Sequence, residues 1–439
     1  MRTATIVGNS APLSLLIRKL LVRLHRYAGL TTAGFLAIAG LTGSVIAFHH
    51  ELDAWLNPEL FKASGKGAML SPGALVAHVE QQFTNVRVVF VRLPSEPGVS
   101  AEVFVVGRPD PATGKALPWR NNHVLVDPVT GDVLGTRSRS DPGLNRAEII
   151  PFLYRFHYSL TLGLWGKWLF GIVALVWLFD CFVGFYLTLP HAKPFLTRWR
   201  PSWFVKTSAG AYRLNFDLHR AAGLWFWIVL AVVAFSSVYF NLNREVFMPV
   251  LKAVASVTPT PTRNRSPLPQ PLYAPPLSWE DAVARAEAEM RRRGIPHRLE
   301  WVGYDPAKGF YSVAYKTPED IMSIHAGTRV YVDAAKGDVI HVSIPGRGTL
   351  GDAVIEWQFP LHSGKAFGLA GRIIICITGI VVAMLSVTGV VIWWRKLSAR
   401  RWMELRRRDT AKAEASHLRE LAAAKVSQLT TISSDTSEA

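Results

Sequence analysis

Four long apolar runs alternate with polar segments along this chain of 439 residues. The runs cover residues 27–48, 168–189, 221–242 and 373–394. Each has about the twenty apolar residues that an α-helix needs to cross a bilayer, and the only charged residue within them is Asp180. The pattern predicts a membrane α-helical protein with four transmembrane helices.

The polar segments after the first and third runs begin with a helical pattern and continue with short stretches that are typical of β-strands. The helices are expected to start at the N-caps Ser71 and Ser278 and to end near residues 83 and 293. Strands are expected at 86–93, 101–106 and 123–126, before a turn at Thr130 and Gly131, and at 298–304, 310–315, 328–332 and 339–342. The chain therefore combines four spans with two α+β domains.

The net charge of +17 at pH 7, with histidine neutral, reflects Lys and Arg residues gathered beside the apolar runs. They cluster at 18–26, 193–213 and 395–408, which four spans place on one side of the membrane. The positive-inside rule makes that side cytoplasmic, with both termini there and both α+β domains outside. Charge distributed in this way indicates contact with membrane lipid and argues against nucleic acid as a partner.

The chain contains an internal duplication, as proteins built from repeated units do. The segment LHRYAGL at 24–30 returns before the third run as LHRAAGL at 218–224, identical at six of seven positions. His157 and His362 precede the second and fourth runs, and each is followed at the same offset by Gly-Leu-x-Gly and a basic residue. The order histidine, apolar run, histidine, apolar run therefore occurs twice.

The four repeated histidines are expected at two depths. His25 and His219 begin outward-going spans at the cytoplasmic face, and His157 and His362 begin inward-going spans at the outer face. The two halves have the same orientation, so their pseudo-symmetry axis runs along the membrane normal and can bring equivalent residues face to face.

Two opposed imidazoles can hold a haem iron from both sides, and an axial histidine pair suits electron transfer. Zinc would require four ligands. No Cys-x-x-Cys-His motif is present, so the expected cofactors are two non-covalent haem b groups. The alternative is that these histidines are ordinary polar residues at the level of the lipid headgroups.

Four further residues are candidates for the same sites. Arg26 and Arg220 are expected to meet haem propionates or to serve only as topogenic charge. His49 ends the first span and is a substitute ligand for the outer haem. Asp180 lies within the second span, where a charge is functional by default, although a buried hydrogen-bonded acid is the alternative. No catalytic residue is assigned.

A set of short motifs resembles the PepSY-associated transmembrane family. The motifs are Leu24-His25-Arg26 with Gly29, Thr42-Gly43, Glu51-Leu52-Asp53, Asn57-Pro58, the Val-Asp-Pro-x-Thr-Gly turn at 126–131, Leu-His-x-Gly at 361–364, and Thr388-Gly389 before Trp393-Trp394. The second turn, at 333–337, lacks the family's Pro and Thr. The resemblance covers residues from about 20 to 400 and implies PepSY folds for the two external domains.

The expected layout has nine parts. They are a cytoplasmic arm (1–26), the first span (27–50), an external PepSY-like domain (51–156), the second span with its leading segment (157–189), a cytoplasmic loop (190–218), the third span (219–242), a Pro-rich linker with a second external PepSY-like domain (243–361), the fourth span with its leading segment (362–394), and a basic, then disordered, cytoplasmic tail (395–439).

The resemblance includes bacterial inner-membrane reductases that hold two haems and release iron from ferric siderophores during uptake. It implies an enzyme that moves electrons outward to a ferric siderophore. No nucleotide-binding fingerprint is present, so the donor is expected to be a separate quinol or cytoplasmic reductase. Residues expected to steer the chelate are Arg87, Arg92, Trp119, Arg120, Arg298, Trp301 and Arg347.

Two other functions remain open. A non-enzymatic anchor could present external domains that bind a peptide or a peptidase, although the duplicated histidines would then have no role. A transporter component would explain the duplication and Asp180. The spans show no sign of the broken helices that transporters use at substrate sites, so a transporter is the weaker alternative.

Overall fold

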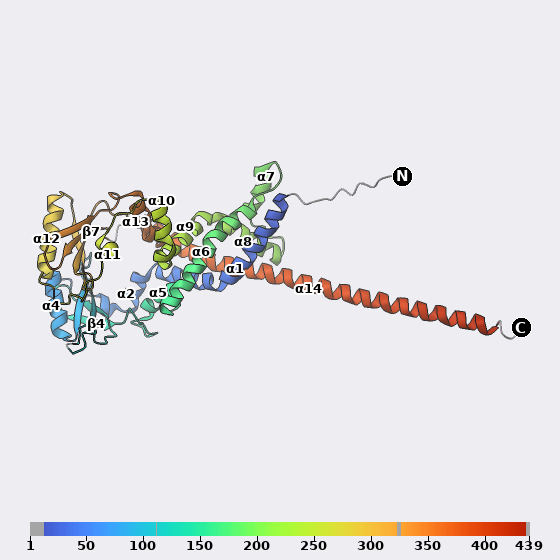
Figure 1. The fold of residues 1–439 in the computed structure, drawn as a ribbon, viewed down its shortest axis with the longest axis horizontal. Coiled ribbons are helices and arrows are strands. Elements are labelled where there is room, and N and C mark those ends of the chain that lie inside the picture. Colours follow the sequence, from blue (N-terminus) through green and yellow to red (C-terminus); the bar gives the residue numbers. More distant parts are fainter. Residues whose placement is uncertain (1–12, 111, 323–325, 436–439) are drawn as a thin grey trace.

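The computed structural model describes residues 13–110, 112–322 and 326–435. A β-sheet with its helices lies at one end of the molecule, a bundle of long helices follows, and α14 projects far beyond the bundle (Figure 1). Residues 1–12 of the expected cytoplasmic arm and residues 436–439 of the expected tail lie outside the described residues.

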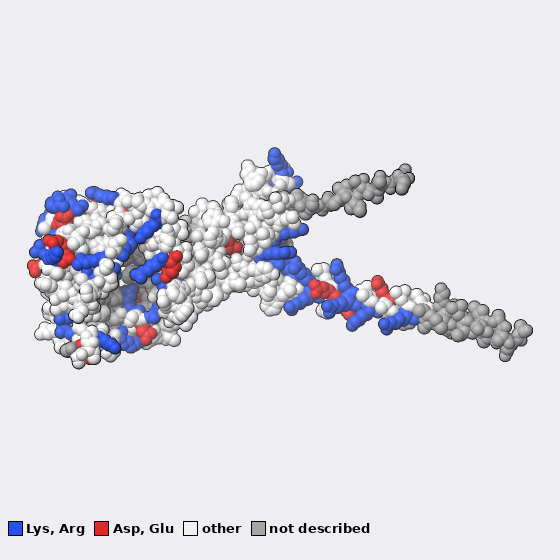
Figure 2. All heavy atoms as spheres, in the orientation of Figure 1, with Lys and Arg blue, Asp and Glu red and all other residues white. Residues whose placement is uncertain are grey.

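Within the described residues, three helices are long and apolar enough to cross a membrane: α1 (Leu13–Ile46), α6 (Gly163–Thr188) and α14 (Gly368–Asp435). The pair α8 (Ala211–Trp225) and α9 (Trp227–Asn241) forms a fourth span if its two members are counted together. The band between the sheet and the basic helix ends is almost uncharged on the face that Figure 2 shows, as a lipid environment requires.

The third span is bent by 70° between α8 and α9, so the expectation of unbroken spans is wrong. Phe226 leaves helical geometry, with φ −100° and ψ 1°. The indole of Trp225 donates a hydrogen bond to the Trp203 carbonyl (3.1 Å), whereas the indole of Trp227 donates to the Cys181 carbonyl (3.0 Å). The two halves of the span are thus attached to different neighbours, which stabilises the bend.

Helices α1 and α14 cross where glycines face each other. A Cβ atom on Gly40 would lie 2.4 Å from the Gly379 carbonyl oxygen, so no larger side chain fits there without movement. One turn away, the Ser44 hydroxyl donates to the Cys376 carbonyl at 2.7 Å. Small residues in the first span therefore allow the close helix approach that is typical of packing in lipid.

One sheet of eight antiparallel strands contains both α+β halves, in the order β4-β3-β2-β1-β5-β6-β7-β8. Its strands are β1 (Val86–Arg92), β2 (Ala101–Gly107), β3 (His123–Val126), β4 (Val133–Arg137), β5 (Arg298–Asp305), β6 (Phe310–Lys316), β7 (Thr328–Asp333) and β8 (Val339–Ser343). The halves join where β1 pairs with β5, with Val91 opposite Val302. The expected separate domains are therefore continuous through their sheet.

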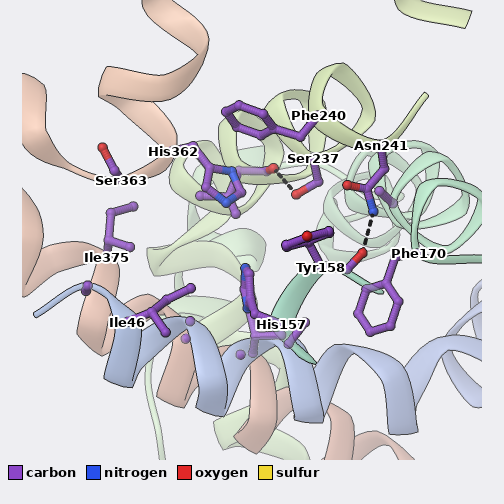
Figure 3. Close-up of a pocket in the computed structure, with 18 of the residues that line it drawn as sticks. Ile46, His157, Tyr158, Phe170, Ser237, Phe240, Asn241, His362, Ser363 and Ile375 are labelled. Carbon is purple, nitrogen blue, oxygen red and sulfur yellow. Dashed lines mark hydrogen bonds between the residues drawn. The ribbon is translucent and has the colours of Figure 1, made fainter. Parts of the chain in front are cut away.

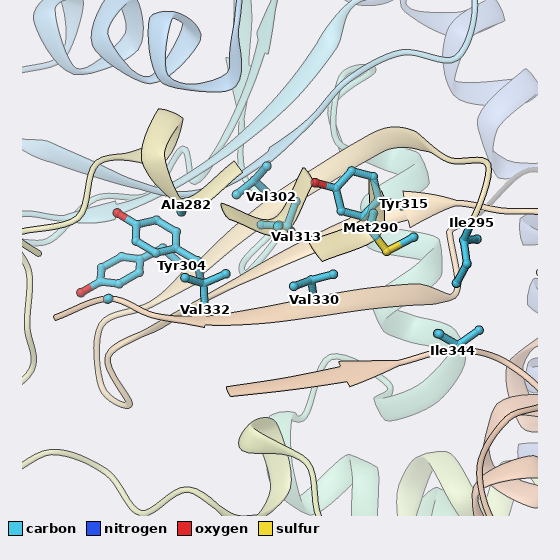
Figure 4. Close-up of a cluster of buried hydrophobic side chains, with 13 residues drawn as sticks. Ala282, Met290, Ile295, Val302, Tyr304, Val313, Tyr315, Val330, Val332 and Ile344 are labelled. Carbon is cyan, nitrogen blue, oxygen red and sulfur yellow. The ribbon is translucent and has the colours of Figure 1, made fainter. Parts of the chain in front are cut away.

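Helices α4 (Pro72–Gln82) and α12 (Trp279–Arg292) cover one face of this sheet. Each begins as expected, because the hydroxyls of Ser71 and Ser278 accept backbone N–H groups in the first turn. Figure 4 shows the buried cluster of the second half, where Met290 of α12 packs among tyrosine and valine side chains of the strands. The opposite face of the sheet is turned toward the long helices (Figure 1).

Shorter elements connect these parts. They are α2 (His49–Leu56), α3 (Pro58–Phe61), α5 (Ile149–Ser159), α7 (Phe195–Trp199), α10 (Met248–Val254), α11 (Pro261–Asn264), α13 (Leu350–His362), 3-10 turns at Arg200–Trp203 and Lys365–Phe367, and a π-helical turn at Asn243–Phe247. Helix α14 continues to Asp435, where a disordered end was expected. Its Ala, Leu, Glu, Lys and Arg residues are strong helix formers and extend a helix already nucleated in the span.

Candidate functional site

The four repeated histidines form two pairs, as the duplication predicts. His157 at the end of α5 faces His362 at the end of α13, with ring centroids 6.4 Å apart. Figure 3 shows these two rings pointing toward one another across a cavity. His25 of α1 and His219 of α8 form the second pair, with centroids 6.1 Å apart. Both pairs therefore join the two halves of the chain.

These distances leave room for one atom between the rings. A direct N–H···N hydrogen bond, about 2.9 Å between nitrogens, would place imidazole centroids about 5.2 Å apart. A metal ion bound to both rings through bonds of about 2.0 Å would place them about 6.3 Å apart. The observed 6.1 Å and 6.4 Å fit the second arrangement.

The Nδ1 atom of each of these histidines is held by an oxygen from a different helix. His157 Nδ1 lies 3.1 Å from the Thr42 hydroxyl, and His362 Nδ1 lies 2.8 Å from the Ser236 hydroxyl. His219 Nδ1 lies 2.9 Å from the Thr388 hydroxyl. Such contacts fix the orientation of an imidazole and direct its other nitrogen, Nε2, away from the supporting group.

The hydroxyl partners also define which nitrogen is protonated. Thr42 donates its own proton to the Ile38 carbonyl (2.7 Å), and Thr388 donates to the Met384 carbonyl (2.7 Å). Ser236 does the same one turn back along α9. Each hydroxyl must therefore accept from the imidazole Nδ1–H. The Nε2 lone pair of each ring is left for a metal.

The fourth histidine has a different partner. His25 Nδ1 lies 2.9 Å from the Asp180 carboxylate, whose side chain is only 15% exposed. A carboxylate is a stronger acceptor than a hydroxyl and raises the basicity of the imidazole that it holds. Asp180 therefore supports His25 instead of standing alone in the membrane, and the two pairs differ chemically at this residue.

Glycines make room for the rings. A Cβ atom on Gly43 would lie 3.0 Å from the Cε1 atom of His157, and one on Gly389 would lie 3.2 Å from the same atom of His219. The Thr-Gly dipeptides at 42–43 and 388–389 thus supply both the hydrogen-bond acceptor and the space beside it.

A cavity of about 630 Å³ surrounds His157 and His362. It lies within the range of about 300–1,000 Å³ that cofactor pockets span. Its walls are mostly apolar, and Lys167 and Lys365 are its basic residues. No cluster of three or more potential metal ligands occurs in the described part of the chain. Paired imidazoles in an apolar cavity fit a metal whose remaining ligands come from a macrocycle, which is the arrangement in haem.

The family model described as the PepSY-associated TM region matches residues 22–396. The chain belongs to this family. No curated protein matches the chain. The PepSY-associated match spans both halves of the duplication and all four histidines, so the family region contains the complete pair of histidine sites.

Other residues predicted for the sites of this PepSY-associated protein lie in varied surroundings. Arg220 is engaged by Asp217 (2.9 Å) and by the Pro201 carbonyl (2.7 Å), so it braces the loop before α8. Arg26 is half-buried next to His25. His49 borders the cavity of His157 and His362, and its ring contacts His50 and Tyr154.

The supporting hydroxyls were not predicted, although the duplication contains a signal for two of them. Thr42 follows His25 by seventeen residues, and Ser236 follows His219 by the same number. Both therefore occupy equivalent positions, and they hold the pair His157 and His362. Thr388 has no such counterpart, because Val183 stands at the equivalent place in the first half and Asp180 acts from one turn earlier.

A buried polar chain links the PepSY-associated motif residue Asp53 to the membrane-facing side of the sheet. Arg137 pairs with Asp53 at 2.8 Å and donates to His123 Nδ1 at 3.1 Å. His123 Nε2 in turn lies 3.0 Å from Glu102. Burial lowers the pKa of His123 to about 4, so the ring is neutral at pH 7 and donates to Glu102.

Glu102 is charged in this chain. Burial acts to raise the pKa of Glu102, but the hydrogen bond from His123 and the positive charges of Arg92 and Arg139 hold it well below its ordinary value. Asp53 therefore has a structural role, because it anchors a network that positions Glu102 and its two arginine neighbours.

Proposed function

We propose that this membrane protein is an oxidoreductase that binds two non-covalent haem b groups, one at each histidine pair. The observation that carries the proposal is the pair of opposed imidazoles at each level, each with Nδ1 held and Nε2 directed away from its support. When bound, haem would supply a one-electron carrier at each level.

The proposed substrate is ferric iron in a siderophore at the outer face. One electron converts each ferric ion to ferrous iron, which a siderophore holds far more weakly, so iron is released for uptake. One molecule of a quinol donor would reduce two ferric ions and yield the quinone and two protons. A cytoplasmic reductase is the alternative donor.

Both histidine pairs involve residues of α1, at two levels of that helix. Thr42 marks the outer pair and His25 the inner pair on the same helix, and their seventeen-residue separation corresponds to about 26 Å along α1. The proposed location is the bacterial inner membrane, with multiple spans and both termini in the cytoplasm. Lys and Arg at the helix ends remote from the sheet support this orientation (Figure 2).

The proposal is tested by colour and by re-oxidation. Purified protein is expected to show a Soret band and to gain sharp α and β bands with dithionite, with two haems per chain. The reduced protein should be re-oxidised on mixing with a ferric siderophore, while an external chelator traps ferrous iron. A colourless preparation, or reduced haems that persist against a panel of ferric chelates, would contradict the proposal.

Asp180 is expected to lower the reduction potential of the inner site. Replacing it in Asp180→Asn weakens the acceptor at His25 Nδ1, which favours the ferrous state. We expect the inner potential to rise by roughly 60 mV, the equivalent of a tenfold change in relative affinity. An optical redox titration measures the potentials of the inner and outer sites. The control is Thr388→Val, which removes a neutral hydrogen-bond partner from His219 in the same histidine pair. Equal shifts in the two variants would contradict a special role for the carboxylate.

The bend between α8 and α9 favours a second candidate function. Broken spans are typical of secondary transporters, where unwound backbone contacts the substrate. At Phe226, however, the flanking indoles use neighbouring carbonyls as partners, which is a packing role. A transporter of this kind would contain no haem, so the haem content of the purified protein distinguishes the two functions.

A further inference from the structure

A recess lies between the sheet and the outer ends of the long helices, and Lys and Arg side chains surround it in the space-filling view (Figure 2). The sheet contributes the face opposite α4 and α12. A row of rings lies on this face, because Phe90 contacts Phe104 at 5.5 Å and Trp301 at 5.2 Å between centroids. We call the recess and this aromatic row the vestibule.

Three arginines lie over the aromatic row. The guanidinium carbon of Arg92 is 5.5 Å from the centroid of Phe90, and that of Arg139 is 5.5 Å from Phe104. Arg329 is 5.5 Å from the centroid of Trp301. A guanidinium held over a ring in this way keeps its outer surface available to a ligand. One N–H group of Arg92 and one of Arg139 donate to Glu102.

The helical side of the vestibule lies next to the cavity of the outer histidine pair. His49, Tyr154 and Lys365 belong to the lining of that cavity. Arg92 lies near enough to repel the charge of Lys365, and Arg139 lies near enough to disfavour protonation of His49. A ligand in the vestibule would therefore lie between the arginines of the sheet and the outer site.

Positive charge exceeds negative charge around this space. The charged side chains include the cations Arg92, Arg139, Arg329, Lys365 and Arg372 and the carboxylates Glu51, Glu102 and Glu356. The ion pair of Arg263 with Asp352, next to Glu356, adds one charge of each sign. Glu102 is shared by Arg92 (3.2 Å) and Arg139 (3.5 Å), so one carboxylate neutralises only one of these two cations. The vestibule is therefore electropositive and attracts anions.

We propose that the vestibule binds an anionic metal chelate with aromatic donor groups, of the tris-catecholate class, and holds it above the outer histidine pair. The surplus of cations complements its negative charge, and its planar rings can stack on guanidinium groups and aromatic side chains. A neutral hydroxamate chelate offers neither interaction. The role of this site in iron reduction rests on the proposed function, whereas the binding itself does not.

Gallium(III) complexes test binding without reduction, because gallium(III) has the charge and size of ferric iron but does not accept an electron. Calorimetric titration of the full chain in detergent would use a trianionic gallium tris-catecholate and a neutral gallium tris-hydroxamate. We expect the trianion to bind at least tenfold more tightly, with an affinity that falls as salt is raised. Arg329→Gln is expected to weaken its binding about tenfold.

Arg291→Gln is the matched control, because it removes one exposed cation from α12 on the opposite face of the sheet. It should leave binding unchanged within about twofold. Equal binding of the two gallium complexes, an affinity insensitive to salt, or equal effects of the two arginine variants would overturn the proposal. If any of these results were found but ferric chelates were still reduced, the proposed function would stand and only the binding proposal would fail. If the gallium tris-catecholate bound tightly but ferric chelates were not reduced, the binding proposal would stand and the proposed function would fail.

Discussion

His362→Ala should reduce the haem content of the purified protein from two groups per chain to one. His25→Ala, as a separate variant, should also keep one haem but lose the other of the two. Each substitution deletes one of two opposed imidazoles whose centroids lie 6.4 Å or 6.1 Å apart. A single remaining histidine would hold the proposed haem iron from one side only. The pyridine haemochrome assay gives the number of haems, and the optical redox titration identifies which potential disappears.

The matched control is His191→Ala, which removes an exposed histidine from the loop between α6 and α7. It should keep both haems. Full haem content in both His362→Ala and His25→Ala would refute the assignment of the pairs. If only His49→Ala lost the outer haem, the outer ligand would be His49, and the symmetric pairing would be wrong at that level.

Arg137→Met should lower the free energy of unfolding of the sheet by about 3–5 kcal/mol. Arg137 is 3% exposed and pairs with Asp53, and it also donates to the Ala147 carbonyl and to His123. Its removal leaves the buried Asp53 carboxylate without its main partner. Thermal or denaturant unfolding followed by circular dichroism measures the effect.

Two controls separate this mechanism from simple loss of charge. The double variant Asp53→Leu with Arg137→Met should recover much of the lost stability, because neither charge then remains buried alone. Arg146→Met breaks the exposed pair with Glu59, and exposed pairs contribute at most about 1 kcal/mol. A double variant as unstable as Arg137→Met alone would contradict the explanation.

The secondary structure of the sheet halves was predictable because its signals are local. Alternation marks a strand such as β2 within seven residues, and the serine caps of α4 and α12 lie directly before their helices. The pairing of β1 with β5 has no such signal, since residues more than two hundred positions apart meet there. The sequence pattern therefore gives two halves but does not indicate that one sheet contains both.

In the candidate site, too, some features are predictable from the sequence and others are not. Duplication predicts which histidines pair, because equivalent positions meet across a symmetry axis. The supporting contact from Thr388 to His219 depends on the rotation of α14 about its own axis, which hydropathy does not specify. The same holds for the basic residues of the sheet. Arg92 faces the vestibule, whereas Arg87 is engaged by Glu80 of α4 and Arg120 by Glu148.

The pairing of β1 with β5 bears on how such a chain is built. These strands are equivalent in the duplication, and they run antiparallel at the centre of the sheet order. An antiparallel contact between identical edges is what a twofold axis imposes on two copies of one protein. The molecule thus has the geometry of a homodimer whose subunits have been joined end to end. Its two halves, synthesised as separate polypeptides, would each expose a central strand as a bare edge, and each would be the complement that covers the other.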